Sequence, residues 1–125
     1  MSILGTGIDV AEVARVAVMI ERWGPRFTHR AFTEAEANYC LPKRRAAECF
    51  AARWAAKEAT YKALGGPRGT KIWRLYEVIR APSGKPTMRL HGRAAEAAER
   101  LGVRHIHVSL THDADLAAAV VVLEG

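Results

Sequence analysis

Residues 50–65 read FAARWAAKEATYKALG, an alanine-rich stretch that suits the interior of a protein but is interrupted by charge. The pattern predicts one long helix from about Arg44 to Leu64, ended by Gly65-Gly66-Pro67. Residues three or four apart share a face of a helix. One stripe therefore collects Phe50, Trp54, Glu58, Lys62 and Gly65. A carboxylate and an ammonium group thus lie at the edge of a stripe whose aromatic residues should point inward.

The segments before this helix predict a strand and two further helices. ILGTGIDV at 3–10 is typical of a buried strand, in which Gly5 and Gly7 let another backbone come close. A helix should follow Asp9 and stop at Gly24-Pro25. A capping-box pattern that begins at Thr33 predicts a short helix, ended by Pro42.

The second half of the chain changes to the periodicity of strands. We expect strands at 72–81, 86–91, 104–111 and 116–124, with a helix at 92–101. Adjacent strands joined by tight turns indicate an α+β fold, in which a mainly antiparallel sheet packs against the long helix. The 125 residues form one predicted domain, residues 1–125.

Composition limits the cellular setting. No apolar run approaches the roughly 20 residues of a membrane span, and no basic region precedes the apolar N-terminal residues as in a signal peptide. We therefore expect a cytoplasmic protein without a membrane partner. Cys40 and Cys49 lack CxxC spacing, so we expect buried or idle thiols rather than a disulfide or a zinc site.

The formal net charge of +6 favours an anionic partner. Nucleic acid, an acidic protein and a phosphorylated small molecule all agree with it. The run Lys43-Arg44-Arg45 motivates a nucleic-acid-binding alternative, but the other basic residues are spread out and no zinc-finger or RNA-recognition motif is present. We therefore expect no nucleic-acid partner.

Two carboxylates have both an ordinary and a functional interpretation. Glu58 and Lys62 can be a surface pair worth about 0.2–0.5 kcal/mol, or a magnesium ligand beside a phosphate-binding ammonium. Asp9 can be a second magnesium ligand, or a helix N-cap with Glu12 as its capping-box partner. The two can share a metal only if the fold brings them together.

The segment HVSLTHD at 107–113 is a polar cluster where a strand enters a turn. A serine, a histidine and an aspartate this close do not indicate a catalytic triad, because no GxSxG elbow is present and triad members usually come from separate segments. The cluster can line a ligand pocket, or His112 and Asp113 can be ordinary turn residues.

Three motifs together resemble one family. GIDVAEVAR at 7–15, FAARWAAKEATYKALG at 50–65 and HVSLTHD at 107–113 resemble holo-acyl-carrier-protein synthases, the small trimeric class of phosphopantetheinyl transferases. The resemblance implies transfer of the phosphopantetheine arm of coenzyme A to a serine of an apo-acyl-carrier protein, with release of 3′,5′-ADP. It also implies a homotrimer whose sites are shared between subunits.

The resemblance assigns a role to individual residues. Asp9 and Glu58 would hold magnesium, Lys62 would contact phosphate, and Arg15 would dock the acidic carrier. Residues implied to contact coenzyme A are Trp54, Lys62, Gly65, Gly84, Lys85, Pro86, Ser109 and His112. The base that activates the serine is left open between Glu58 acting through a water molecule and the pair His112–Asp113.

The sequence departs from the family pattern at a few positions. Trp54 replaces the more usual phenylalanine, and Leu75 stands where an aspartate is frequent. Only some members have an acid at the position of Asp113. A catalytically idle trimeric homologue is therefore a second alternative to the enzyme.

Overall fold

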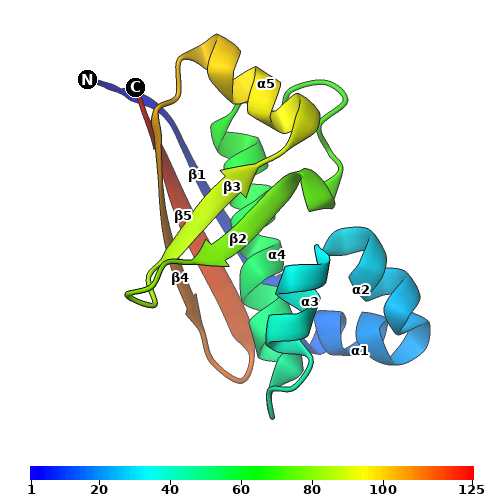
Figure 1. Cartoon of the computed structure of the whole chain (residues 1–125). Helices are drawn as coiled ribbons and strands as arrows, with labels where there is room; N and C mark the ends of the chain where they lie inside the picture. The colour runs from blue at the N-terminus through cyan, green and yellow to red at the C-terminus, as the bar shows by residue number, and fades with distance from the viewer.

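The computed structural model describes all 125 residues, as two antiparallel sheets arranged around one long helix (Figure 1). The strands are β1 (Ile3–Glu12), β2 (Tyr76–Arg80), β3 (Pro86–Leu90), β4 (His105–His112) and β5 (Leu116–Glu124). The helices are α1 (Val13–Trp23), α2 (Pro25–Ala31), α3 (Glu34–Cys40), α4 (Ala46–Ala63) and α5 (Gly92–Leu101), and a 3-10 helix at Trp73–Leu75 precedes β2.

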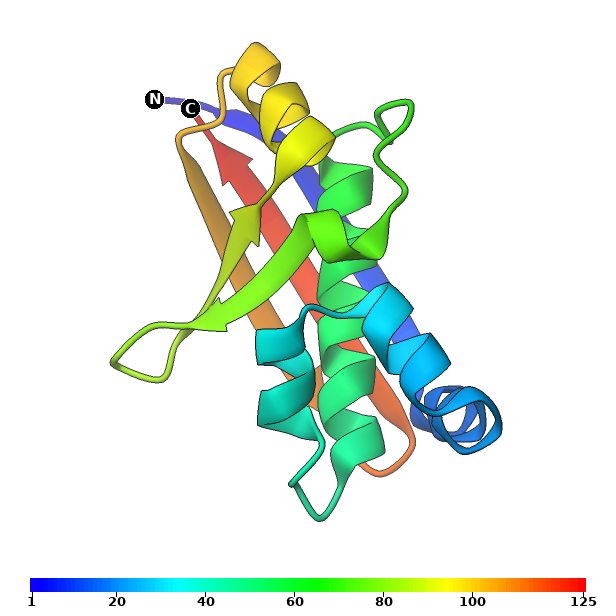
Figure 2. The same ribbon diagram turned by 45° about the vertical axis from the view of Figure 1, so that its right-hand side comes forward.

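The larger sheet has the strand order β1-β5-β4, and β2 and β3 form a separate hairpin. Helix α4 lies between this sheet and the hairpin (Figures 1 and 2). The two ends of the chain meet, because the backbone N–H groups of Ser2 and Gly125 each donate to the other's carbonyl oxygen. These observations confirm the predicted α+β fold, with its antiparallel strands divided between two sheets.

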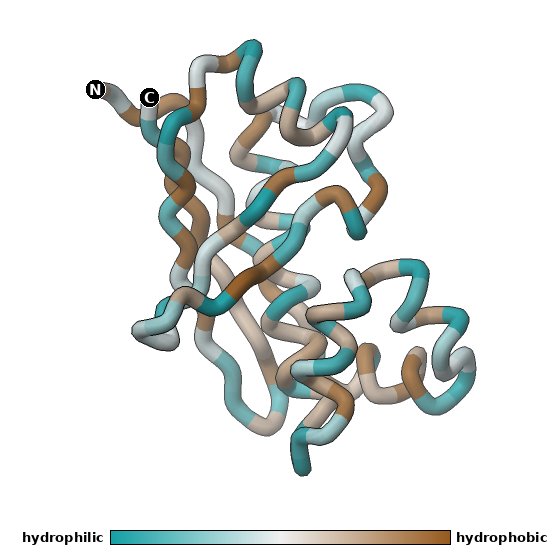
Figure 3. The backbone as a smooth tube through the Cα atoms, viewed as in Figure 1, coloured by the Kyte–Doolittle hydropathy of each residue, from teal (hydrophilic) through white to brown (hydrophobic).

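Small residues let α4 be buried on most of its surface. Six alanines of this helix are almost completely buried: Ala51, Ala52, Ala55, Ala56, Ala59 and Ala63. They give the helix a pale, weakly hydrophobic colour in Figure 3. A Cβ atom on Gly7 would lie 1.9 Å from the Ala59 carbonyl oxygen, and one on Gly5 would lie 2.2 Å from that of Ala63. The predicted close approach of another backbone to β1 is therefore confirmed, and that backbone belongs to α4.

The pleat of β1 decides which residues face this helix. Side chains alternate between the two faces of a strand, so Asp9 shares the α4 side with Gly7 and Ala11. Ile8 and Val10 point to the other face, where they are 66% and 55% exposed. The glycines thus bring β1 close to α4, and the strand period directs Asp9 toward it.

The structure corrects three local predictions. Asp9 is not a helix cap, because β1 continues to Glu12 and α1 begins at Val13. Three helices rather than two precede α4: α1 ends before Gly24-Pro25 as predicted, and Pro25 then starts α2, where its fixed φ suits the first helical turn. The strand expected from Ile72 begins only at Tyr76, after the 3-10 turn. By contrast, the capping box of Thr33 and Glu36 is confirmed.

The prediction of free thiols is wrong. Cys40 and Cys49 form a disulfide with their Cα atoms 5.5 Å apart, joining the end of α3 to the first turns of α4. The chain reverses direction between these helices, so residues distant in sequence become neighbours. Nothing in the spacing of the two cysteines signals that reversal.

The helices are too short or too polar to cross a membrane.

Candidate functional site

The first candidate site lies where β1 passes over the middle of α4. Lys62 Nζ is 2.5 Å from Asp9 Oδ1, and the Nε1–H of Trp54 donates to Glu58 Oε1 at 2.5 Å. The fold therefore brings together the two carboxylates that the sequence left apart, with Lys62 beside them. Asp9 and Glu58 could share a cation only if the fold brings them together, and the structure does so.

This site contains more negative than positive side chains: two carboxylates, Asp9 and Glu58, and one ammonium group, Lys62. Burial and, next, the Asp9 carboxylate raise the pKa of Glu58 above its ordinary value. The hydrogen bond to Asp9 raises the pKa of Lys62. Lys62 is thus the only cation bonded to the carboxylates, and Glu58 faces a second anion without an ammonium of its own. Two adjacent carboxylates with one exposed counter-charge favour the binding of a further cation.

A pocket of about 260 Å³ opens beside these carboxylates. Its lining combines residues from β1, α1, α2 and α4: Asp9, Val10, Ala11, Glu12, Arg15, Val16, Met19, Phe27, Trp54 and Glu58. Arg15 therefore lies at the same pocket as the two carboxylates, as expected for a residue near the site. Six of the ten lining residues are hydrophobic, and three others, Asp9, Glu12 and Glu58, are acidic.

The donor set fits magnesium better than a metal held wholly by protein. Nowhere in the structure do three or more His, Cys, Asp or Glu side chains gather around a possible ion position. Magnesium is commonly held by one or two carboxylates together with substrate phosphates and water. Asp9 and Glu58 match that pattern, so a cation here would depend on a phosphorylated ligand for its remaining oxygens.

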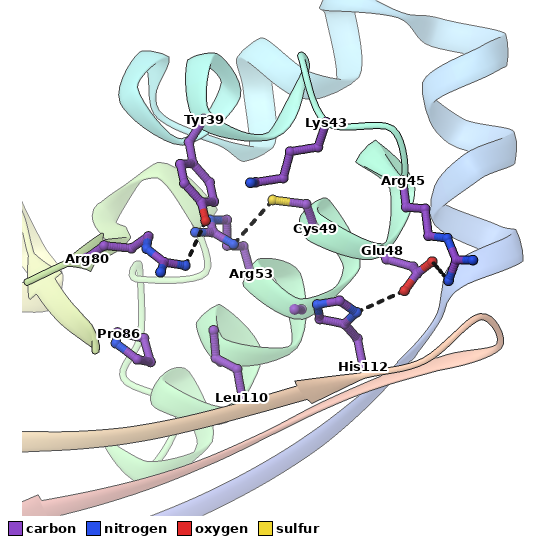
Figure 4. Close-up of a pocket in the computed structure, with 11 residues that line it drawn as sticks. Tyr39, Lys43, Arg45, Glu48, Cys49, Arg53, Arg80, Pro86, Leu110 and His112 are labelled. Carbon is purple, nitrogen blue, oxygen red and sulfur yellow. Dashed lines mark hydrogen bonds and ion pairs between the residues drawn. The ribbon is translucent and has the colours of Figure 1, made fainter. Parts of the chain in front are cut away.

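A second, larger pocket of about 500 Å³ lies near the start of α4 (Figure 4). His112 and Pro86, both expected to contact coenzyme A, line it. Four basic residues also line it: Lys43 and Arg45 from the basic run at 43–45, and Arg53 and Arg80, for which the sequence predicts no role. The positive charge indicates that this pocket suits an anionic group.

Arg53 is the most telling of these basic residues. It is buried beside the Tyr39 ring, its Nη1–H donates to Cys49 Sγ at 3.4 Å, and its Nε has no hydrogen-bond partner. Although burial would raise it, the cations Lys43, Arg80 and Arg53 lower the pKa of the Tyr39 hydroxyl. A guanidinium in a basic pocket suits charge-assisted hydrogen bonds to an anion. The only sequence signal for it was the basic run at 43–45, which suggested nucleic acid instead.

The expected pair of His112 and Asp113 does not form in this chain. His112 Nδ1 lies 2.9 Å from Glu48 Oε1 on α4. Asp113 Oδ1 instead accepts from the backbone N–H groups of Asp115 and Leu116, both at 2.8 Å, and these bonds lower the pKa of Asp113. Asp113 thus has the geometry of an ordinary turn residue, and Glu48 is the carboxylate that contacts His112.

The remaining predicted contacts are spread over the surface. Gly65 follows the end of α4 with φ +85°, and Gly84 occupies the β2–β3 turn with φ +89° beside Lys85. Ser109 is exposed on β4, opposite Val120 of β5. None of these three lines either pocket, and the two pockets share no lining residue. Arg53 and Trp54, neighbours on α4, face different pockets.

Comparison with known proteins relates both regions to one family. The model of the 4′-phosphopantetheinyl transferase superfamily matches residues 5–121. A holo-[acyl-carrier-protein] synthase of Koribacter versatilis is 53% identical over 123 residues, 98% of each chain. One of Streptomyces coelicolor is 48% identical over 125 residues and covers 100% of both chains.

Solved structures agree with this relationship. The holo-[acyl-carrier-protein] synthase of Neisseria meningitidis has a TM-score of 0.87 and 29% identity, covering 99% of this chain and 100% of that chain. The one from Helicobacter pylori, solved in complex with coenzyme A, has a TM-score of 0.81 and 28% identity, covering 95% and 99%. The likeness thus extends over the whole length of the chain.

Proposed function

Since this chain belongs to the 4′-phosphopantetheinyl transferase superfamily, we propose that it transfers 4′-phosphopantetheine from coenzyme A to a serine hydroxyl of an apo-acyl-carrier protein. The products are the holo-carrier and 3′,5′-ADP. The observation that carries this proposal is the meeting of Asp9, Glu58 and Lys62 over α4. Transfer of a phosphoryl group requires neutralised charge and a positioned nucleophile, and these residues supply the first.

Magnesium is the cation we propose for Asp9 and Glu58. When bound, it would neutralise the charge that develops on the diphosphate of coenzyme A. Lys62 is bonded to Asp9 but is about half exposed, with a side-chain exposure of 54%, so its ammonium can turn to a phosphate oxygen when the ligand arrives. Trp54 forms the apolar wall beside this group.

The nucleophilic serine also needs a base. Glu58 is one candidate, because its raised pKa brings it closer to the working range of a general base. His112 is the other, and Glu48 rather than Asp113 is the carboxylate that orients its ring. We assign Asp113 to holding the turn that presents His112.

The basic pocket around Arg53 is proposed to bind the phosphates at the nucleotide end of coenzyme A. Arg53 and Arg80 present guanidinium groups, which suit bidentate contacts with phosphate, and His112 and Pro86 lie at its edge. Gly84, Lys85, Gly65 and Ser109 are proposed to contact the same substrate from the adjoining turn, helix end and strand.

We further propose that the enzyme is a homotrimer with sites shared between subunits. The outer face of the β1-β5-β4 sheet exposes apolar residues in a contiguous register, with Ile8 paired to Val120 and Val10 to Ala118. Such a patch is typical of an interface. The pockets of Asp9 and His112 are separate within one chain, so pairing them across an interface would make one site.

Mixed trimers test this arrangement. Asp9→Ala and His112→Ala chains, each nearly inactive alone, should recover part of the activity when unfolded and refolded together, because some sites then contain both intact residues. If both residues act in the same chain, every site keeps one defect and nothing is recovered. A monomer in light scattering at micromolar concentration would contradict the trimer.

Arg15 is proposed to dock the acidic carrier protein. It lies on α1 at the rim of the pocket that contains Asp9 and Glu58, where a positive charge would guide an acidic partner. Arg15→Glu should therefore raise the KM for the carrier and its sensitivity to salt, with less effect on the KM for coenzyme A. Equal losses for both substrates would contradict docking.

The decisive test of the function is a mass measurement. An apo-carrier incubated with the protein, coenzyme A and magnesium should gain the mass of one phosphopantetheine, and omission of coenzyme A should prevent the gain. An idle homologue would give no gain. A nucleic-acid-binding protein would instead be retained on DNA at low salt and released at modest salt, with no effect of coenzyme A. We propose that the reaction takes place in the cytoplasm, in fatty-acid or polyketide synthesis.

A further inference from the structure

The Glu58 carboxylate accepts one hydrogen bond from another side chain, and the donor is an indole. Trp54 Nε1–H donates to Glu58 Oε1 at 2.5 Å, from one turn earlier on α4. Lys62, the nearest candidate cation, bonds to Asp9 instead. The orientation of the Glu58 carboxylate within the chain therefore depends on Trp54.

The indole is held firmly enough to act as a fixed donor. Its ring packs against Phe27, Phe32 and Trp73, with centroid distances of 5.6, 6.2 and 5.8 Å. These contacts come from α2, from the residue after it and from the 3-10 turn, so the ring is enclosed on several sides. A donor fixed in this way restricts one oxygen of Glu58 and leaves the other free.

A phenylalanine at this position would keep much of the aromatic packing but could not donate a hydrogen bond to Glu58. Groups that hydrogen-bond to a metal-binding carboxylate orient it, and their loss typically weakens metal affinity by about 10–100-fold. The tryptophan thus adds a hydrogen-bond donor to the aromatic packing at this position.

We propose that Trp54 is a positioning residue for the cation site: its indole N–H fixes Oε1 of Glu58 so that the carboxylate faces Asp9 and a divalent cation. This inference rests on the proposed function, since it takes Asp9 and Glu58 to be the cation ligands. This role is separate from the coenzyme A contact that the resemblance implies for Trp54, because it acts through Glu58.

The test compares Trp54→Phe with the unaltered protein by manganese binding, followed by electron paramagnetic resonance of free Mn²⁺ in the presence of coenzyme A and without carrier. We expect Trp54→Phe to bind Mn²⁺ about 10-fold more weakly. Trp23→Phe is the matched control, because Trp23 is about half exposed on α1 and makes no bond to Glu58, and it should bind as the unaltered protein does.

Kinetics separates positioning from a general structural role. In Trp54→Phe the magnesium concentration for half-maximal rate should rise by a similar factor, and raising magnesium to saturation should reduce the rate deficit relative to the unaltered protein. A merely structural defect would lower kcat at every magnesium concentration. Replacing Trp54 by benzothienylalanine, which keeps the bicyclic shape but has sulfur in place of N–H, covers the case in which Trp54→Phe fails to fold.

The outcomes distinguish the two proposals. If the unaltered protein binds Mn²⁺ and both N–H-deficient variants bind it equally well, the role of Trp54 is overturned and the cation site stands. If the unaltered protein with coenzyme A binds no Mn²⁺, the cation site fails, and the inference fails with it. Weaker binding in both variants with the Trp23→Phe control unchanged supports the proposal.

Discussion

Lys57 and Lys62 lie on the same helix, on either side of Glu58 in the sequence, yet they occupy opposite environments. The side chain of Lys57 is fully buried, and its Nζ donates to Glu36 Oε1 at 2.6 Å and to the carbonyl oxygens of Trp73 and Tyr76. Lys62 is 54% exposed and bonds only to Asp9. One lysine thus ties the fold together, and the other is free to meet a ligand.

The surroundings of Lys57 explain how a charge can be buried here. Glu36 also accepts hydrogen bonds from the backbone N–H groups of Thr33 and Val78, so the ion pair links α3, α4 and β2. Burial lowers the pKa of Lys57, and the Glu36 carboxylate opposes that shift. A buried pair of this kind is costly to break on one side, because the remaining charge loses its partner.

The largest expected effect is the loss of this pair. Lys57→Met should lower the free energy of unfolding by about 3–5 kcal/mol, because it leaves Glu36 buried without its cation. Urea unfolding followed by circular dichroism measures the change. The double variant Lys57→Met/Glu36→Gln removes both charges and should recover part of the loss. A decrease below about 1 kcal/mol would contradict a structural role.

Glu58, between the two lysines, should behave in the opposite way. Glu58→Gln should lower turnover by about 100-fold or more, since a bound metal contributes several kcal/mol of transition-state stabilisation. It should not lower the melting temperature of the metal-free protein. Glu58→Gln should therefore lower catalysis without lowering stability, whereas Lys57→Met should lower stability.

The pH dependence gives the sign of the Glu58 effect. Its pKa is raised in the folded state, so its favourable contribution is present at pH values below the ordinary carboxyl pKa and is lost as pH rises through the folded-state value. Glutamine carries no charge at any of these pH values, so the Glu58→Gln variant avoids this loss of stability at high pH. It should melt at the same or a higher temperature than the unaltered protein at pH 8. A lower melting temperature at pH 8, or near-normal turnover with magnesium, would contradict the assignment.

The disulfide tests how far the Lys57 pair alone holds α3 against α4. Cys40–Cys49 joins the same two helices as Glu36–Lys57. For a loop this short, reduction should cost about 2–3 kcal/mol of unfolding free energy. Urea midpoints with and without dithiothreitol measure it, and Cys40→Ser/Cys49→Ser should not respond to the reductant. Two free thiols in the denatured, unreduced protein would contradict the bridge.

Much of this fold could be predicted because local signals agreed with it. The glycines of β1, the capping box at Thr33 and the alternation in the C-terminal strands each depend on neighbours in the sequence. The stripe of Phe50, Trp54, Glu58 and Lys62 predicted the middle of the site for the same reason. Helical periodicity is a property of a short segment, and the structure keeps it.

The remainder depends on contacts between distant segments. Lys57 and Lys62 are the same residue type in one helix, and only the position of Glu36 makes the first structural. Arg53 became part of a pocket, and Cys40 met Cys49, through the packing of α3 against α4. The sequence likewise gave no reason to choose Glu48 over Asp113 as the partner of His112, because Glu48 is on another element.

The smallest expected effect on stability is that of Lys62→Met. An exposed pair contributes about 0–1 kcal/mol, so the free energy of unfolding should fall by less than about 1 kcal/mol. The hydrogen bond to Asp9 raises the pKa of Lys62, so the contribution is complete below the ordinary lysine value and is lost only as pH rises through the folded-state pKa. The difference in unfolding free energy between Lys62→Met and the unaltered protein should therefore stay constant between pH 6 and 9.

Salt and ligand binding complete the contrast between the two lysines. The small stability difference caused by Lys62→Met should disappear in 1 M sodium chloride, since the Debye length is then about 3 Å, whereas the difference caused by Lys57→Met should persist because that pair is buried. Calorimetry should show coenzyme A binding weakened by about 10-fold in Lys62→Met, through loss of one charge-assisted contact to phosphate, and largely retained in Lys62→Arg. If Lys62→Met destabilised the fold as much as Lys57→Met, or bound coenzyme A normally, the division between a lysine of the fold and a lysine of the site would be wrong.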